Sequence, residues 1–289
     1  MTNETPLLPR LRLALALAAG ILLGGCSPFT YLNAVAPDEH YLSEPNIAYG
    51  GLPRQRLDLY RPLRQSAQAV PVVVFFYGGG WKGGARGDYR FVAAELASRG
   101  VLVVVPDYRV YPEVVFPAFV EDGALAVKWV QGRVAQYGGD TGKIYLMGHS
   151  AGAHIAAMLA LNRRYLESAG AEGDHLAGFI GLAGPYDFLP VTSKTMKRIF
   201  GDPAPRSTQP IDFVTAAAPP VLLVTGEDDR TVLPENSRRL AERIRAAGGS
   251  AREISYEGVG HARIVGAFSP PLSKGVPVVE DVLRFIERS

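Results

Sequence analysis

Residues 143–161 read KIYLMGHSAGAHIAAMLAL, in which the turn Gly148-His149-Ser150-Ala151-Gly152 separates a short apolar run from a longer one. The first run has the length of a buried strand, and the second has the spacing of a helix. A serine between two glycines on a strand-to-helix turn is typical of a nucleophile elbow, because the tight turn lifts the hydroxyl out at the end of the strand. The stretch therefore predicts an exposed, nucleophilic Ser150 at the carboxyl end of a strand.

Strand-like runs alternate with helix-like runs on both sides of this turn. The strand-like runs are Arg56–Tyr60, Val70–Tyr77, Val101–Val105, Lys143–Met147, Phe179–Ala183, Val221–Thr225 and Ala251–Tyr256. The helix-like runs are Phe91–Arg99, Val120–Tyr137, Ala153–Leu161, Glu235–Ala247 and Val278–Arg288. Apolar strands that alternate with helices form parallel sheets covered on both faces. We therefore expect one α/β domain over residues 46–289, with a mostly parallel central sheet.

One segment interrupts the alternation. Residues 187–220 show no clear period and carry prolines at 190, 203, 205, 210, 219 and 220. A long segment of this kind in a compact domain is usually functional. We expect it to lie above the sheet as a small irregular cap or pocket wall.

The composition indicates a large apolar core and little net charge. The 289 residues are 47% hydrophobic, and the formal net charge is +2 at pH 7. This balance argues against nucleic acid as the main partner. No spacing typical of a metal site stands out, so we expect neither a metal nor a cofactor.

The amino terminus resembles a bacterial lipoprotein signal peptide over residues 1–25. Arg10 and Arg12 precede an apolar stretch too short to span a bilayer comfortably, and Leu23-Gly24-Gly25-Cys26 resembles a lipobox. The resemblance implies that Cys26 becomes the lipidated first residue and anchors the protein in a lipid bilayer. The alternative is a plain secretory signal or an uncleaved anchor with an incidental cysteine.

The same resemblance implies a location in the cell envelope. Ser27 after the cysteine implies delivery to the outer membrane if the host is Gram-negative. Residues 26–45 hold three prolines and no clear period, so we expect a tether between anchor and domain. Cys26 is the only cysteine in the sequence, which rules out an intrachain disulfide.

A nucleophilic serine needs a base to take its proton and an acid to orient that base. Candidates for both follow Ser150. One strand-like run ends in Gly226-Glu227-Asp228-Asp229, and an acid after a parallel strand lies at the same sheet edge as the elbow. His261 follows the last strand-like run in a Gly-rich stretch that lets its ring reach Ser150. Glu227, Asp228 and Asp229 all qualify as the acid by their chemistry.

The order serine, acid, histidine resembles that of the α/β-hydrolase family. From about Ile47 to its end, the chain resembles the esterase and lipase branch, near the hormone-sensitive-lipase-like and feruloyl-esterase-like lipoproteins. In that family the acid lies three residues after the glycine that ends the strand and three before a valine. The resemblance therefore implies Asp229, with Asp228 as the alternative.

A second motif, Tyr77-Gly78-Gly79-Gly80-Trp81, stands where this family carries a His-Gly-Gly-Gly oxyanion loop. The resemblance implies that the backbone N–H groups of Gly78, Gly79 and Ala151 stabilise the oxyanion. Tyr77 replaces the family histidine, which leaves open how the loop is braced. Trp81 either lines the acyl pocket or belongs to the core.

Five further residues have mainly structural interpretations. Asp107 and Arg109 follow a strand, and we expect them to pair and fix the oxyanion loop. His149 is expected beside the loop, and His154, one helical turn beyond Ser150, is expected to be structural. Tyr186, after another strand-like run, either contacts substrate or packs in the core.

Together these features predict a serine hydrolase that cleaves carboxylic esters of small to medium acyl length through an acyl-enzyme. An arylformamidase-like amide hydrolase and a feruloyl-type esterase are alternatives. An inactive hydrolase fold that serves as an envelope binding protein is an alternative of another class. The sequence leaves the acyl group and the oligomeric state open.

Overall fold

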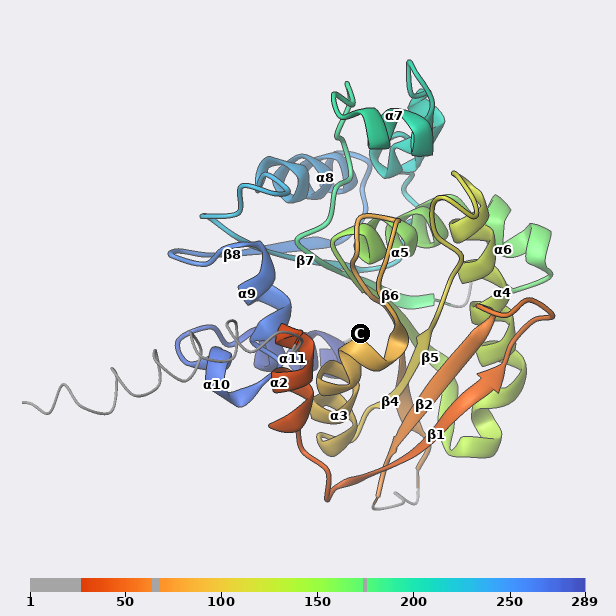
Figure 1. Ribbon diagram of the computed structural model, residues 1–289, viewed down its shortest axis with the longest axis vertical. Coiled ribbons are helices and arrows are strands. Elements are labelled where there is room, and N and C mark those ends of the chain that lie inside the picture. Colours follow the sequence, from red (N-terminus) through yellow and green to blue (C-terminus); the bar gives the residue numbers. More distant parts are fainter. Residues whose placement is uncertain (1–26, 64–67, 174–175, 289) are drawn as a thin grey trace, which may run out of the picture.

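The computed structural model describes residues 27–63, 68–173 and 176–288 (Figure 1). Cys26 and the predicted signal peptide lie outside these residues. The strands are β1 (Tyr41–Ala48), β2 (Arg56–Pro62), β3 (Val70–Phe76), β4 (Leu102–Pro106), β5 (Gly139–His149), β6 (Leu176–Leu182), β7 (Val221–Gly226) and β8 (Ala251–Tyr256). They form one sheet in the order β1-β2-β4-β3-β5-β6-β7-β8.

The sheet is mostly parallel, as predicted. The pairs β1–β2 and β2–β4 are antiparallel, and every other neighbouring pair in this sheet is parallel. The central strands are apolar and buried along most of their length, which is the pattern of strands covered on both faces. The fold is therefore that of an α/β hydrolase, with an antiparallel amino-terminal edge.

The main helices are α2 (Pro28–Ala34), α3 (Arg90–Ser98), α4 (Ala118–Arg133), α5 (Ala151–Leu161), α6 (Arg164–Ala169), α7 (Lys194–Phe200), α8 (Glu235–Ala246), α9 (His261–Gly266), α10 (Pro270–Ser273) and α11 (Val278–Arg288). Short 3₁₀ turns are η1 (Arg86–Tyr89), η2 (Val134–Tyr137), η3 (Arg206–Thr208) and η4 (Pro210–Phe213). In the part of the chain that is described, no helix combines the length and the apolar character needed to cross a bilayer.

The helices cover both faces of the sheet (Figure 1). On one face, Phe75 of β3 contacts Tyr89 of η1, and Tyr145 of β5 contacts Phe285 of α11. On the other, α4 and α5 pack together, with Gly123 of α4 close to side chains of α5 and β3. This arrangement agrees with right-handed crossovers, because α3 and α5 connect strands that advance in opposite directions across the sheet.

The segment expected to be a tether is instead largely structured. Residues 28–34 form α2, and β1 begins at Tyr41. Asn33 holds α2 in place, because its side chain donates to the carbonyls of Gly87 and Asp88 at 2.8 and 3.2 Å and accepts from the N–H of Phe91 at 3.0 Å. The prediction of a tether was wrong there because these partners lie more than 50 residues away in sequence.

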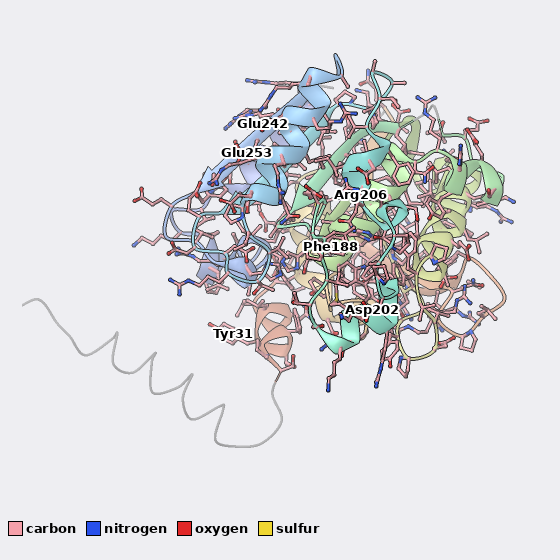
Figure 2. The ribbon with its side chains drawn as sticks, turned by 90° about the horizontal axis from the view of Figure 1, so that it is seen from above. Tyr31, Phe188, Asp202, Arg206, Glu242 and Glu253 are labelled. Atoms are coloured by element: carbon pink, nitrogen blue, oxygen red, sulfur yellow. The ribbon has the colours of Figure 1, made fainter. Side chains whose placement is uncertain are left out.

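The segment over the sheet is less irregular than predicted. It contains α7, whose first turn is capped by Ser193 through a bond from the N–H of Met196 at 3.1 Å. Seen from above, Phe188 and Arg206 lie over the middle of the molecule, whereas Tyr31 of α2 lies at its periphery (Figure 2). The segment therefore covers the carboxyl ends of the strands as a small cap.

Candidate active site

Ser150 lies on a strained turn between β5 and α5. Its φ is +54°, in the left-handed region that a non-glycine residue rarely adopts. A Cβ on Gly148 would lie 2.3 Å from the carbonyl oxygen of Gly152, and one on Gly152 would lie 2.0 Å from that of Phe76. Both positions therefore require glycine for the close approach of strand and helix, and the turn presents a partly exposed Ser150.

The structure brings Ser150, His261 and Asp229 together from three separate elements. The Nε2 atom of His261, at the start of α9, lies 2.9 Å from the Ser150 hydroxyl oxygen. Its Nδ1 atom lies 2.7 Å from a carboxylate oxygen of Asp229, in the turn after β7. The Asp229 carboxylate can only accept a hydrogen bond, so Nδ1 of His261 carries the proton that it donates. Nε2 of the neutral ring is then free to accept from the serine hydroxyl.

The Asp229 carboxylate is buried and fixed by its own hydrogen bonds. One oxygen accepts from the backbone N–H groups of Thr231 and Val232 at 2.8 and 2.9 Å. Burial raises the pKa of Asp229, but the bonds from His261 and from the two N–H groups outweigh burial and hold the pKa below its ordinary value. Asp228, the alternative acid, is exposed.

His149 packs against the ring of His261, with ring centroids 4.9 Å apart. Burial, followed by the proximity of His261, lowers the pKa of His149 to about 3, so the ring is neutral near pH 7. The Nε2–H group of His149 donates to the backbone carbonyl of His261 at 3.3 Å. The variable residue of the elbow therefore supports the histidine loop, whereas the sequence predicted only that it would lie beside the glycine loop.

The glycine loop begins directly beside the elbow. A Cβ on Gly78 would lie 3.2 Å from the Cβ of Ser150. Burial raises the pKa of Tyr89 to about 12, and the N–H of Gly78, which interacts with the phenol, opposes this rise. Among the described residues no hydrogen bond is recorded from the N–H of Gly79 or Ala151. Of the three expected oxyanion donors, Gly78 is thus directed toward Tyr89, while the other two retain free N–H groups.

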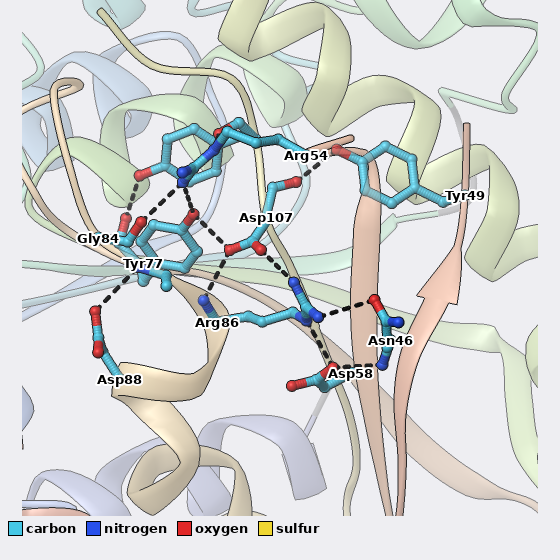
Figure 3. A network of polar contacts seen from close by, with 11 residues as sticks. Asn46, Tyr49, Arg54, Asp58, Tyr77, Gly84, Arg86, Asp88 and Asp107 are labelled. Carbon is cyan, nitrogen blue, oxygen red and sulfur yellow. Dashed lines mark hydrogen bonds and ion pairs between the residues drawn. The ribbon is translucent and has the colours of Figure 1, made fainter. Parts of the chain in front are cut away.

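Tyr77 takes up the bracing position at the head of this loop (Figure 3). Its hydroxyl donates to Asp107 at 2.8 Å and accepts from Arg54 at 2.9 Å. Its backbone carbonyl accepts from the Tyr108 hydroxyl at 2.7 Å, and the two rings stack 4.7 Å apart. Burial, together with the nearby charge of Asp107, raises the pKa of Tyr77 well above its ordinary value, so the hydroxyl stays protonated.

The expected pairing of Asp107 with Arg109 was wrong. Asp107 pairs with Arg86, which also reaches Asp58 at 2.7 Å (Figure 3). Arg109 turns the other way and binds the buried carboxylate of Asp122 on α4 at 2.8 and 2.9 Å. In a regular strand, side chains two positions apart would share a side, but β4 ends at Pro106 and residues 107–110 are not in a strand. Asp107 and Arg109 therefore reach separate partners, Arg86 and Asp122.

The two residues proposed for the substrate pocket are both buried. Trp81 lies in an aromatic cluster beside the glycine loop, in contact with Phe119, His154, Phe188 and Phe200. Tyr186 packs beneath the surface against Phe179, and a Cβ on Gly181 would overlap its hydroxyl. This geometry favours the packing interpretation for Tyr186. Trp81 keeps both interpretations, since its cluster joins the loop to the cap.

His154 is structural, as expected. Its Nε2–H group donates to the carbonyl of Thr208 at 2.9 Å, which ties α5 to η3 of the cap. Burial lowers its pKa to about 4, so it is neutral near pH 7. Within the described ranges, no group of three or more His, Cys, Asp or Glu side chains is placed to hold a metal ion.

Sequence reasoning missed Arg54 and Tyr108 as supports of the glycine loop. Arg54 lies in the turn between β1 and β2, and its guanidinium donates to the carbonyls of Tyr108 and Gly84, both at 2.8 Å. Tyr108 is the second residue after β4. Tyr108 stands in the run Pro106-Asp107-Tyr108-Arg109, which resembles a family signature, but no local pattern marks Arg54. The contacts of both residues depend on how β2, β4 and β3 are ordered in the sheet.

The relatives to which this chain is similar are named as esterases. A probable isoprenylcysteine alpha-carbonyl methylesterase of Arabidopsis thaliana, ICMEL1, is 31% identical over 322 aligned positions that cover 98% of this chain and 67% of the relative. Esterase LipC of Mycobacterium tuberculosis is 30% identical over 243 positions, which cover 76% of this chain and 60% of the relative. The chain spans 56 to 67% of the length of the plant methylesterases it matches.

A solved structure and a family model agree with this result. Esterase B of Lactobacillus rhamnosis, inhibited by a C4-C4 tributyrin phosphonate, has a TM-score of 0.76 at 20% identity, over 99% of this chain and 97% of the other, which shows the shared fold. The family model BD-FAE matches residues 57–244, well over half of the chain. The sequence match and the relatives together show that the chain belongs to the BD-FAE family of α/β hydrolases.

Proposed function

We propose that this carboxylesterase-type hydrolase cleaves carboxylic esters of small to medium acyl length through an acyl-enzyme on Ser150. The observation that carries the proposal is the pair of hydrogen bonds that joins Ser150 to His261 and His261 to Asp229, at 2.9 and 2.7 Å. A nucleophile, a base and an orienting acid in this order are what ester hydrolysis by a serine requires.

In the proposed reaction, the Ser150 hydroxyl attacks the ester carbonyl while Nε2 of His261 takes its proton. Asp229 stabilises the resulting imidazolium. The carbonyl oxygen becomes an oxyanion, which the N–H groups of Gly79 and Ala151 stabilise. The tetrahedral intermediate collapses, and the alcohol leaves with the proton from His261. Water then attacks the acyl-enzyme by the same steps in reverse and releases the acid.

Substitution of Ser150 by alanine tests this assignment. We expect Ser150→Ala to keep the melting temperature within a few degrees and to lower hydrolysis of 4-nitrophenyl butyrate by at least about 10³-fold. A fluorophosphonate probe should label the wild-type protein but not the variant. Ser98→Ala, which removes a hydroxyl bonded within α3, is the control and should remain active. Full activity of Ser150→Ala would refute the proposal, and a wild-type protein inert to the probe would favour a binding protein.

The acyl and alcohol groups are the finer part of the proposal. The buried aromatic cluster around Trp81 closes one side of the loop region, which supports an acyl group of limited size. The names of the plant relatives point to methyl esters, and that of the solved neighbour's inhibitor to C4 acyl chains. A series of 4-nitrophenyl esters from acetate to decanoate tests this size limit. An N-formyl aromatic amine and a feruloyl ester test the amide and aryl-ester alternatives.

We also propose that the enzyme is a lipoprotein of the cell envelope. The support is the lipobox-like run that ends at Cys26, with a basic and then an apolar segment before it. Acyl chains on Cys26 would give stable membrane attachment. Cys26→Ser should release the protein from the membrane fraction and abolish incorporation of labelled fatty acid. Unchanged retention and labelling would exclude this role for Cys26.

A further inference from the structure

The glycine loop that follows β3 depends on support from outside itself. Gly79, Gly80, Trp81 and Gly84 all have φ values in the left-handed region, at +140°, +61°, +58° and +99°. Trp81 is not a glycine, and a non-glycine residue in this region persists only where the surrounding structure holds it there. Five of the seven residues 78–84 are glycines without side chains to anchor them. The loop therefore keeps its shape only if its two ends are fixed.

One side chain reaches both ends of this loop (Figure 3). The Nη2 atom of Arg54 donates to the hydroxyl of Tyr77 at 2.9 Å and to the carbonyl of Gly84 at 2.8 Å. Tyr77 precedes the loop and Gly84 ends it. The Nε atom of Arg54 donates to the carbonyl of Tyr108 at 2.8 Å. The planar guanidinium thus holds the two ends of the loop at a fixed separation and ties both of them to the chain just after β4.

The partner of Arg54 at the head of the loop is itself immobilised. The Tyr77 ring stacks between those of Tyr89 and Tyr108, with centroids 5.7 and 4.7 Å away. Its hydroxyl donates to Asp107, which also accepts from the backbone N–H of Arg86 at 2.8 Å. Because the Tyr77 hydroxyl donates to Asp107, its lone pair is left for Arg54. A guanidinium and a carboxylate therefore hold this hydroxyl from two sides.

We propose that Arg54 is a positioning residue that sets where the free N–H group of Gly79, in the glycine loop, meets the oxyanion. The inference rests on the proposed function of that loop. Arg54 lies in the β1–β2 turn, outside the residues that match the family model, so it is a contribution of the amino-terminal hairpin. A displacement of oxyanion donors by about 1 Å lowers the rate by on the order of 10²-fold without preventing substrate binding.

Two variants of Arg54 and one control test the proposal in the full-length protein. Arg54→Met keeps the unbranched apolar stem of the side chain but removes its donors, and Arg54→Lys keeps the charge but cannot span both loop ends. Arg90→Met removes a half-buried guanidinium that binds the Tyr41 hydroxyl and the Asn33 carbonyl, away from the loop. It controls for loss of stability alone and should leave kcat within about twofold.

For Arg54→Met we expect kcat for 4-nitrophenyl butyrate to fall about 10- to 100-fold with KM nearly unchanged, and for Arg54→Lys a smaller fall. The inhibition constant of an alkyl trifluoromethyl ketone, whose adduct with serine carries an oxyanion, should rise in proportion to KM/kcat across the variants. A purely structural role would not produce this proportionality. Unchanged kcat in folded Arg54→Met, or ketone affinity that stays constant while kcat falls, overturns the proposal.

A second route keeps the test decisive if Arg54→Met does not fold. Tyr77→Phe removes the hydroxyl that Arg54 contacts but keeps the stacked ring, so it should lower kcat in the same direction. Combined with Arg54→Lys, its effect should be less than additive, because both remove one contact. Full additivity counts against the inference. Fluorophosphonate labelling of the wild-type protein distinguishes failure of the proposed function from failure of the Arg54 inference. If the wild-type protein is not labelled, the proposed function is overturned. If it is labelled but the Arg54 variants keep the wild-type kcat, only the role of Arg54 is overturned.

Discussion

Asp229 and Asp228 are adjacent acids with opposite environments, which makes them a matched pair. Asp229 is buried and bonded to His261, whereas Asp228 is exposed. Asp229→Asn should lower kcat by on the order of 10⁴-fold, because an amide can hold the imidazole in the wrong tautomer. Asp228→Asn should leave kcat nearly unchanged. Steady-state kinetics on both variants checks this. A larger loss of kcat in Asp228→Asn than in Asp229→Asn would show that Asp228 and not Asp229 is the acid.

The depressed pKa of Asp229 also predicts how its contribution to stability depends on pH. A carboxyl group whose pKa is lower in the folded state stabilises the protein fully above its unfolded pKa, here 3.8. That contribution disappears as the pH falls through the folded pKa. The difference in unfolding free energy between the wild-type protein and Asp229→Asn should therefore be constant from pH 5 to 7 and shrink below about pH 4. Urea unfolding at a series of pH values measures it, and a difference that grows toward low pH would contradict the sign.

At the scale of single residues, the sequence was most informative where chemistry depends on local turns. Ser150 was predictable because the glycines on both sides and the strand-to-helix context are contiguous. His261 and Asp229 were predictable from their order and from the strands before them. Arg54 was not, because a guanidinium in a turn carries no signal until the sheet places it against Gly84.

Among the secondary-structure elements, α2 offers a test of how the amino-terminal arm is attached. The side-chain oxygen of Asn33 accepts from the N–H of Phe91, one of the unpaired donors at the start of α3, and so acts as a helix cap from outside the helix. Asn33→Ala should therefore lower stability by about 1–2 kcal/mol and release the arm. Thr30→Ala, at an exposed position of the same helix, is the control.

Hydrogen exchange and limited proteolysis check this prediction. In Asn33→Ala, amides of residues 28–36 should exchange faster and a protease should cut the arm sooner, while the central strands stay protected. The same protection of the arm in Asn33→Ala and Thr30→Ala would show that Asn33 does not hold it.

The elements that sequence patterns predicted well are those buried along their length. The central strands and α3, α4, α5, α8 and α11 lie within a few residues of their predicted bounds. Strand β1 was missed because only its backbone joins the sheet, and most of its side chains are exposed or half-exposed. Pro45 also argued against a strand, but an edge strand tolerates a residue without an N–H group.

For the molecule as a whole, the position of the site follows from topology. Parallel strands β5 and β7 carry Ser150 and Asp229 at their carboxyl ends, and His261 follows β8 in the same direction. A parallel sheet brings all three to one edge, which is why chain order alone predicted that they would meet. The aromatic cluster that Trp81 forms with the cap could not be predicted, because its partners Phe188 and Phe200 come from a distant part of the chain.

The ion pair between the half-buried Arg109 and the buried Asp122 tests what holds the whole domain together. The fully buried Asp122 on α4 accepts from the Gln55 side chain at 2.9 Å, as well as from the backbone and side chain of Arg109. Asp122 thereby joins helix α4 to the amino-terminal hairpin, through Gln55, and to the loop after β4, through Arg109. Arg109→Met would leave a buried carboxylate without its counter-charge, and we expect a loss of about 3–5 kcal/mol in unfolding free energy.

Substitution of Asp122 as well as Arg109 distinguishes the effect of an unpaired buried charge from the effect of lost packing. Asp122→Asn in the Arg109→Met background removes the stranded charge. It keeps one oxygen, which can accept from the backbone N–H of residue 109 or from Gln55 but not from both, because these donors bond to different carboxylate oxygens. The double variant should therefore be more stable than Arg109→Met alone, although Asp122→Asn by itself should destabilise the wild-type protein. Urea unfolding of all four proteins closes the cycle. If the double variant is the least stable of the four, packing and not the buried charge governs this link between the hairpin and the helices.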